Sequence, residues 1–125
     1  MRSDVRDRCD RFLQHIDELG ELLADLQTFG EPDAAWHAQE WKRFAIAEML
    51  AVRAFSEWEA LAHDVFILWL ARDTSALARS TELDLEATVS KDMAEALLTA
   101  TGYLDFRSVS ELRAKSRKWL VDSPF

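Results

Sequence analysis

An all-α fold is predicted by three features of this 125-residue sequence. Only three Gly and two Pro are present, so the turn signals that a sheet needs are scarce. Apolar residues recur at helical spacing, and 49% of the residues are hydrophobic, which is enough to bury one core. We therefore expect a single domain over residues 1–125, built as an up-and-down helical bundle of about four main helices.

The first helix is predicted by a heptad seam. Apolar residues alternate at spacings of four and three, which places them on one narrow stripe of a helix. The stripe consists of Val5, Cys9, Phe12, Ile16, Leu19, Leu23 and Leu26. Ser3 suits the N-cap of a helix that we expect over residues 4–28. Gly30 and Pro32 suit a short connection to the next helix, so the first two helices should be antiparallel neighbours.

The second helix is predicted over residues 34–72, a stretch that contains neither Gly nor Pro. Its first half is amphipathic, but residues 65–70 are apolar on every side of the helix. This segment is therefore buried, either at the centre of the domain or in a contact between subunits. In the second case, the interface side chains are Phe66, Ile67, Trp69 and Leu70.

The rest of the chain is predicted to form a helical turn and two shorter helices. Residues 73–90 are rich in hydroxyl side chains and have no long period, which indicates a short helical turn and an irregular connection. Ser90 can cap a helix over residues 91–101, which Gly102 would end. Ser108 and Glu111 have the spacing of a capping box ahead of a last helix that reaches about Leu120.

Charge and composition exclude several classes of function. The formal net charge of −8 argues against a protein that coats nucleic acid with its whole surface. The single cysteine, Cys9, can form no internal disulfide, so we expect a reducing, cytoplasmic location. The longest apolar run, residues 65–71, is far shorter than the roughly 20 residues that cross a bilayer, and no membrane contact is expected. The three histidines lack metal-ligand spacing, so neither a metal nor another cofactor is expected.

Two groups of polar residues are candidates for chemistry. Glu59 and His63 lie four apart on one face of the second helix, where a carboxylate can orient an imidazole as a general base. Exposed pairs of this kind are also common without any function. The last helix carries a dense basic cluster: Arg113, Lys115, Arg117 and Lys118. This cluster suits RNA phosphate or an acidic partner, although cations also stabilise the last turns of a helix.

The order of the segments carries a family resemblance. A heptad-seamed first helix precedes a long second helix that contains AFSEWEALAHDVF, and a polar break leads to SKDMAEALLTATGYLDF and SVSELRAKSRKWL. This pattern, over residues 40–120, resembles the helical domains called HEPN. The likeness is closest to the branch linked to RNA metabolism and to toxin–antitoxin and defence loci. The resemblance implies an all-α domain that forms a homodimer in a system that targets RNA.

The catalytic motif of that family is missing from its usual place. Ribonuclease members carry Arg, four to six residues and then His on a late helix, and two copies meet to form the RNA-cleaving site. The last predicted helix contains no histidine. The spacing occurs instead at Arg8 and His15, on the first helix. On this resemblance they are the candidate catalytic pair, with the imidazole as general base and the guanidinium on the scissile phosphate.

Two functions therefore follow from the resemblance. The favoured one is a HEPN-like domain of an RNA-targeting toxin or defence system that binds a partner or dimerises without catalysis of its own. The alternative is a metal-independent endoribonuclease that uses Arg8 and His15. An end on Ser-Pro-Phe directly after the last helix favours a chain shortened at its C-terminus, and a naturally non-catalytic relative is the other explanation. A homodimer or another protein partner is expected, and RNA is a further candidate partner.

Overall fold

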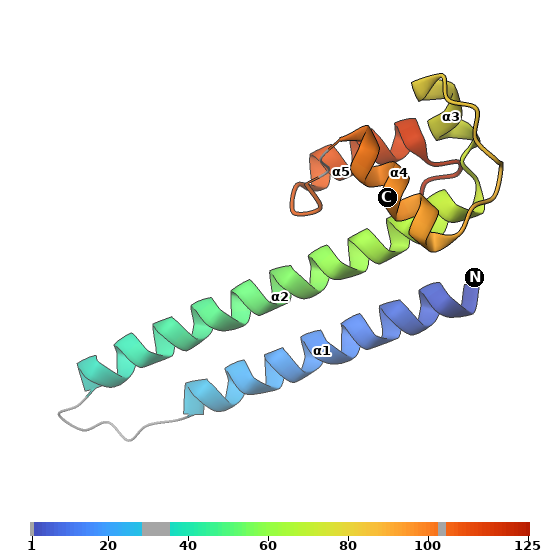
Figure 1. The fold of residues 1–125 in the computed structure, drawn as a ribbon. Coiled ribbons are helices and arrows are strands. Elements are labelled where there is room, and N and C mark those ends of the chain that lie inside the picture. The colour runs from blue at the N-terminus through green and yellow to red at the C-terminus, as the bar shows by residue number, and fades with distance from the viewer. Residues whose placement is uncertain (1, 29–35, 103–104) are drawn as a thin grey trace.

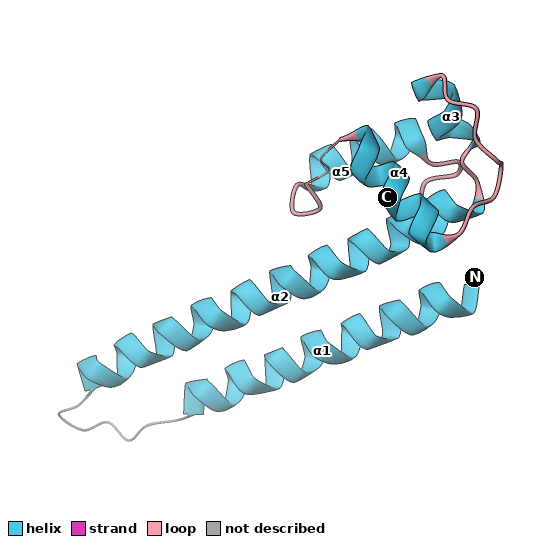
Figure 2. Ribbon diagram, in the orientation of Figure 1, coloured by secondary structure: helices cyan, strands magenta, loops and turns pink. Residues whose placement is uncertain are grey.

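The protein consists of helices and loops in the ranges that the computed structural model describes, which are residues 2–28, 36–102 and 105–125 (Figure 2). Those residues form α1 (Arg2–Thr28), α2 (Trp36–Arg72), α3 (Ser75–Thr81), α4 (Lys91–Thr101) and α5 (Val109–Trp119). The predicted all-α class is thereby confirmed. The predicted connection at Gly30 and Pro32 lies outside the described residues.

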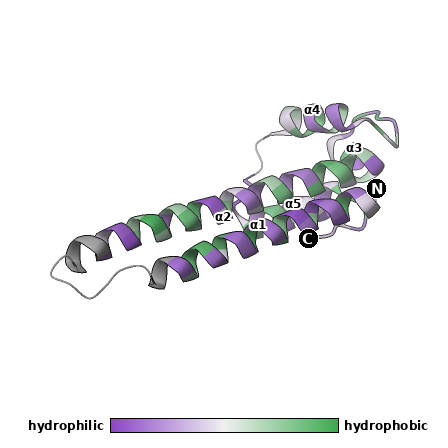
Figure 3. Ribbon diagram, turned by 90° about the horizontal axis from the view of Figure 1, so that it is seen from below, coloured by the Kyte–Doolittle hydropathy of each residue, from purple (hydrophilic) through white to green (hydrophobic). Residues whose placement is uncertain are grey.

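The two long helices form an antiparallel pair, which we call the hairpin (Figure 1). The heptad seam of α1 faces α2, and the rings of Phe12 and Trp58 meet edge to face with their centroids 6.4 Å apart. The seam is half-buried from Val5 to Leu19, and Leu23 is 40% exposed. Hydrophobic and hydrophilic residues alternate along both helices (Figure 3). The predicted pairing is confirmed, but two helices alone do not seal the seam from solvent.

The other three helices gather around the C-terminal end of α2 (Figure 1), and we call residues 62–125 the head. The ring of Phe66 lies at its centre, 5.9 Å from the ring of Phe106 and 6.4 Å from that of Trp119. The head contains all the buried hydrophobic residues in the described part of the chain: Ala62, Val65, Phe66, Ile67, Leu68, Leu70, Ala71, Leu77, Ala94, Leu98, Phe106, Leu112, Trp119 and Leu120.

The predicted subunit interface at Phe66, Ile67, Trp69 and Leu70 is wrong. Phe66 and Leu70 are fully buried and Ile67 nearly so, all within the core of the head. Trp69 packs against the same core and donates its indole N–H to the carbonyl oxygen of Asp122 at 3.1 Å. The head helices surround this part of α2, and that explains why its residues are apolar on every side.

Hydrogen bonds hold the connection between α3 and α4 against the end of α2. The backbone N–H of Thr74 donates to the carbonyl oxygen of Ala87 at 3.0 Å, and that of Val89 donates to Ala71 at 2.9 Å. The fully buried Thr74 hydroxyl donates to the carbonyl oxygen of Glu86. The predicted irregular connection is therefore an ordered part of the head.

The predicted N-caps of the last two helices are present, although the backbone N–H of Ser108 donates to the carbonyl oxygen of Asp105 and not to Glu111, as a full capping box requires. Ser90 Oγ accepts a hydrogen bond from the backbone N–H of Met93 at 3.1 Å, and Ser108 Oγ accepts one from Glu111 at 3.3 Å. Gly102 ends α4 with a φ of 121°, a conformation that favours glycine. Local sequence signals therefore predict both helix starts and the end of α4.

Candidate functional site

The N-terminal half of α2 exposes large apolar side chains, which we call the apolar stripe. Its members are 63–70% exposed: Trp41, Phe44, Met49, Val52 and Phe55. Phe44, Phe55 and Phe66 are eleven residues apart, about three turns, so they share one face of the helix. The head covers that face at Phe66, whereas the same face is open at Phe44 and Phe55.

An apolar groove continues the stripe toward the head. It runs between α1, α2 and the start of α5 and has a volume of about 510 Å³. Its main lining residues are Phe12, Ile16, Phe55, Trp58 and Val109, with Arg107 at one edge. Phe55 belongs to both features, so the stripe and the groove form one continuous apolar surface.

The hairpin outside the head has no core of its own. In residues 3–25 and 40–61, whose exposure the structure describes, no residue is buried. Helices in proteins owe most of their stability to the packing of an apolar face. This part of the hairpin therefore holds apolar surface that its own two helices do not cover.

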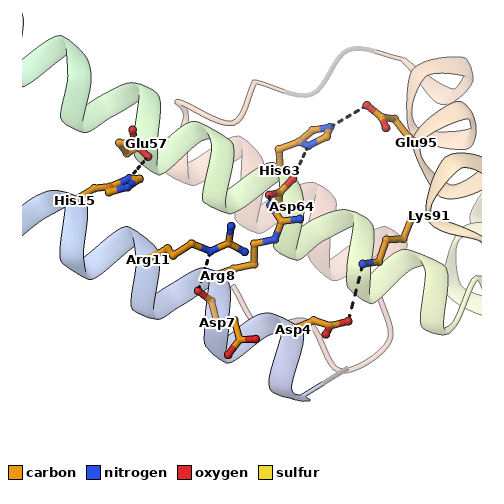
Figure 4. A network of polar contacts seen from close by, with 10 residues as sticks. All are labelled: Asp4, Asp7, Arg8, Arg11, His15, Glu57, His63, Asp64, Lys91 and Glu95. Atoms are coloured by element: carbon orange, nitrogen blue, oxygen red, sulfur yellow. Dashed lines mark hydrogen bonds and ion pairs between the residues drawn. The ribbon is translucent and has the colours of Figure 1, made fainter.

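A polar ladder joins α1 to α2 beside the seam (Figure 4). Arg8 donates a hydrogen bond from Nη1 to Asp64 Oδ2, and His15 Nδ1 lies 2.9 Å from Glu57 Oε2. With Arg11, these residues line a recess of about 130 Å³. The structure thus brings the predicted catalytic pair to one recess, together with two carboxylates that sequence reasoning did not connect to it.

The two rungs of this ladder have the same antiparallel register. His15 follows Arg8 by seven residues, and its partner Glu57 precedes Asp64 by seven residues. The two helices therefore present matching charges two turns apart. In this arrangement the guanidinium of Arg8 is held by a carboxylate of its own chain, and the rungs set the register of the hairpin.

Glu57 contacts both His15 of α1 and Arg53 of its own helix. Its pKa is lowered, chiefly by the hydrogen bond from His15 and further by the charges of His15 and Arg53. Arg53 Nη2 lies 2.8 Å from Glu57 Oε1. Glu57 is therefore ionised at neutral pH and can hold the imidazole of His15 in one orientation, as a general base would require.

The predicted pair of Glu59 and His63 does not form. Glu59 Oε2 instead accepts a hydrogen bond from Arg107 Nε at 2.9 Å. His63 Nδ1 lies 3.6 Å from Asp64 Oδ1, and its Nε2 lies 3.8 Å from Glu95 Oε1 (Figure 4). Glu59 therefore links α2 to the segment before α5, His63 links α2 to α4, and the structure supports no catalytic dyad there.

The basic cluster of α5 divides in two, and Lys115 belongs to the structural part. Its Nζ lies 3.5 Å from Glu111 Oε1 and 5.2 Å from the centre of the Trp119 ring. A cation over an indole face and beside a carboxylate is already stabilised within its own helix. Lys115 is therefore a weak candidate for contact with RNA or a partner.

The other part of the cluster lies on the surface. Arg113, Arg117 and Lys118 are exposed, and the last two line a recess between α3 and α5. Arg79 of α3 lines the same recess. Sequence reasoning missed Arg79 because it lies 38 residues before Arg117, and only the packing of α3 on α5 brings them together.

Other kinds of site find no support in the described ranges. Those residues contain no group of three or more His, Cys, Asp or Glu side chains placed to hold a metal ion. Within the same ranges, no helix combines the length and hydropathy needed to cross a membrane. Cys9 is a half-buried free thiol in the seam of α1, where it packs as a small apolar residue.

Comparison with protein-family models, with curated proteins and with solved structures gives no match. The likeness to HEPN domains therefore stays a prediction from the pattern of segments. Function is inferred from the exposed apolar surface of the hairpin, the polar ladder and the basic recess.

Proposed function

We propose that this chain is a helical dimerisation module, a HEPN-like domain of an RNA-targeting toxin or defence system, which pairs two copies through the apolar stripe. The order of helical segments supports the family and the kind of system. The exposed stripe on α2 supports the pairing and carries the proposal.

The physical argument starts from the uncovered hairpin. Monomeric proteins rarely expose large contiguous apolar surfaces, and such surfaces mark sites of interaction. Here five large apolar side chains are at least 63% exposed on a helix pair without a core. Two hairpins laid side by side would form a four-helix bundle with both stripes in its interior.

A second copy is the occupant that fits best. It supplies a hairpin of the same length with the same apolar stripe, and closed twofold pairs are the commonest oligomers. The open face of α2 also continues the face that the head covers at Phe66. A twofold partner would therefore extend the existing core along α2 toward Trp41.

Substitution of glutamate for residues of the apolar stripe tests this proposal. We expect the wild-type chain to form a dimer of twice its 14.4 kDa mass in sedimentation velocity experiments. Phe55→Glu and Val52→Glu should each weaken dimerisation by about 100-fold, because each buries a carboxylate against apolar surface. Met93→Glu is the matched control, since Met93 is 52% exposed on α4, outside the stripe.

The proposal fails if the wild-type chain stays a monomer at high concentration. It also fails if both stripe variants dimerise as tightly as the wild type. A mixed complex that forms only with an added foreign helical protein would point to a heterologous partner and against the homodimer.

A metal-independent endoribonuclease is the second candidate function. The observation that favours it is the shared recess of Arg8, His15, Glu57 and Asp64, where a carboxylate holds the imidazole. The ion pair of Arg8 with Asp64 counts against it, because a neutralised guanidinium is less available to a phosphate.

Incubation with labelled single-stranded RNA separates the two functions. Cleavage by the wild type that is lost in both Arg8→Ala and His15→Ala would establish the nuclease. No cleavage by a folded, dimeric wild-type chain would leave the dimerisation module as the function. Circular dichroism of each variant shows whether the helices are retained.

A further inference from the structure

Three cations converge on one recess of the head. Arg79 comes from α3, and Arg117 and Lys118 come from α5. The recess has a volume of about 490 Å³, and the side chains of Leu120 and Val121 contribute apolar lining beside the cations. This site lies in the head, away from the apolar stripe, and is independent of the proposed dimerisation.

Among the described residues these three cations form no ion pair with a carboxylate, although Arg79 lies close enough to Asp73 for the two charges to interact. No ion pair or side-chain hydrogen bond joins Arg79, Arg117 or Lys118 to another described residue. In contrast, Arg8 and Arg53 in the hairpin each face a carboxylate. Three cations in one recess, none of them in an ion pair with a described carboxylate, are unusual in a chain of net charge −8.

Helix dipoles offset only part of this charge. Arg79 lies in the last turn of α3, and Arg117 and Lys118 lie in the last turn of α5. Each helix C-terminus carries at most about half a negative charge, so the two ends together offset about one of the three positive charges. Asp73 offsets a further part of the charge of Arg79, and the net positive charge that remains attracts an anion.

We propose that this recess binds the terminal phosphate of a small phosphorylated compound. Arginine binds phosphate oxygens through two parallel N–H donors, and lysine adds a compact charge. A phosphate monoester is close to dianionic at neutral pH. The half-buried Val121 would contact the carbon part of the ligand, whereas Leu120 is 4% exposed and belongs to the core of the head.

A long polyanion fits this surface less well than a small ligand. Attraction from the recess is screened beyond about 10 Å, whereas a nucleic acid strand extends past that distance over an acidic protein. The net charge of −8 would repel the rest of such a strand. The recess is therefore assigned to a single phosphate group.

Calorimetric titration at fixed ionic strength tests the assignment, with inorganic phosphate and glycerol phosphate as probes. We expect saturable binding of one phosphate per chain. Arg79→Gln and Arg117→Gln should each weaken binding by about 10-fold, since each removes a charged hydrogen-bond donor. Arg113→Gln is the matched control, because Arg113 is an exposed cation of α5 that does not line the recess.

Three outcomes would overturn the assignment. The first is a wild-type chain that shows no saturable binding of either probe. The second is equal binding by the wild type and by the double variant Arg79→Gln/Arg117→Gln. The third is an RNA oligonucleotide that binds more tightly than glycerol phosphate and loses affinity equally in Arg113→Gln and Arg117→Gln, which would indicate an extended polyanion surface.

Discussion

Glu57 is one of the residues that join the two long helices. Its carboxylate lies 2.9 Å from Nδ1 of His15 in α1 and 2.8 Å from Nη2 of Arg53 in its own helix. Only 17% of its side chain is exposed, so solvent screens these contacts less than those of a surface pair. The lowered pKa of Glu57 is the measurable consequence of this environment.

Glu57 should make stability depend on pH in the acid range. Since its pKa in the folded chain lies below the ordinary value of 4.5, ionised Glu57 stabilises the fold above that value. The contribution is lost as the pH falls through the lowered pKa. We therefore expect the Tm of the wild type to fall more steeply than that of Glu57→Gln between about pH 6 and about pH 3.

Thermal melting followed by circular dichroism measures this difference. Glu21→Gln is the control, because Glu21 is exposed on α1 and forms no ion pair with a described residue. Parallel pH profiles for the wild type and Glu57→Gln would contradict the role of Glu57.

The hairpin is the least tightly packed element of the described structure. Its seam is half-buried from Val5 to Leu19, and the ladder of Arg8 and His15 adds charge pairs in a single register. A slip of one turn would separate both rungs at once. The ladder therefore specifies the pairing of α1 with α2, while the seam supplies its apolar contacts.

A charge in the seam should loosen the hairpin. Ile16 is half-buried and lines the apolar groove, so Ile16→Asp should lower the free energy of unfolding by about 2 kcal/mol. Leu13→Asp should change it by less than about 0.5 kcal/mol, because Leu13 is 57% exposed. Urea denaturation followed by far-ultraviolet circular dichroism compares the two, and equal losses would contradict the packing of the seam.

The whole molecule is unevenly built, since its core lies in the head and its uncovered apolar surface lies on the hairpin. Phe66 and Phe55 occupy the same face of α2, but Phe66 is fully buried and Phe55 is 63% exposed. The difference comes from α4 and α5, which cover α2 only near its C-terminal end (Figure 1). Stability and association should therefore depend on different residues of one helix.

Alanine at these two positions should separate stability from association. Phe66→Ala should lower the free energy of unfolding by about 3–5 kcal/mol, because it opens a cavity in the core. Phe55→Ala should leave the stability of the monomer nearly unchanged and weaken dimerisation. Urea unfolding below the dimer's dissociation constant and sedimentation above it measure the two effects, and equal destabilisation by both changes would contradict this division.

The sequence by itself determined the helices and the limits of α4 and α5, whereas Ser3, the predicted N-cap of the first helix, lies inside α1, which begins at Arg2. Apolar spacing predicted α1 and α2, and Ser90, Ser108 and Gly102 predicted the limits of the shorter helices. These signals are local, because helical periodicity, N-caps and glycine C-caps each depend on residues within about one turn of each other. The short connection at Gly30 and Pro32 predicted that the two long helices are antiparallel neighbours.

Only the tertiary structure decided which helix each side chain meets. Phe66 and its neighbours read equally well as core or as interface, and the packing of α3–α5 placed them in the core. Glu59 accepts a hydrogen bond from Arg107, which lies 48 residues later in the sequence. Arg79 and Arg117 line the same recess only because α3 packs on α5. Helical periodicity specifies the face on which a residue lies, but the partner of that face depends on how distant elements pack.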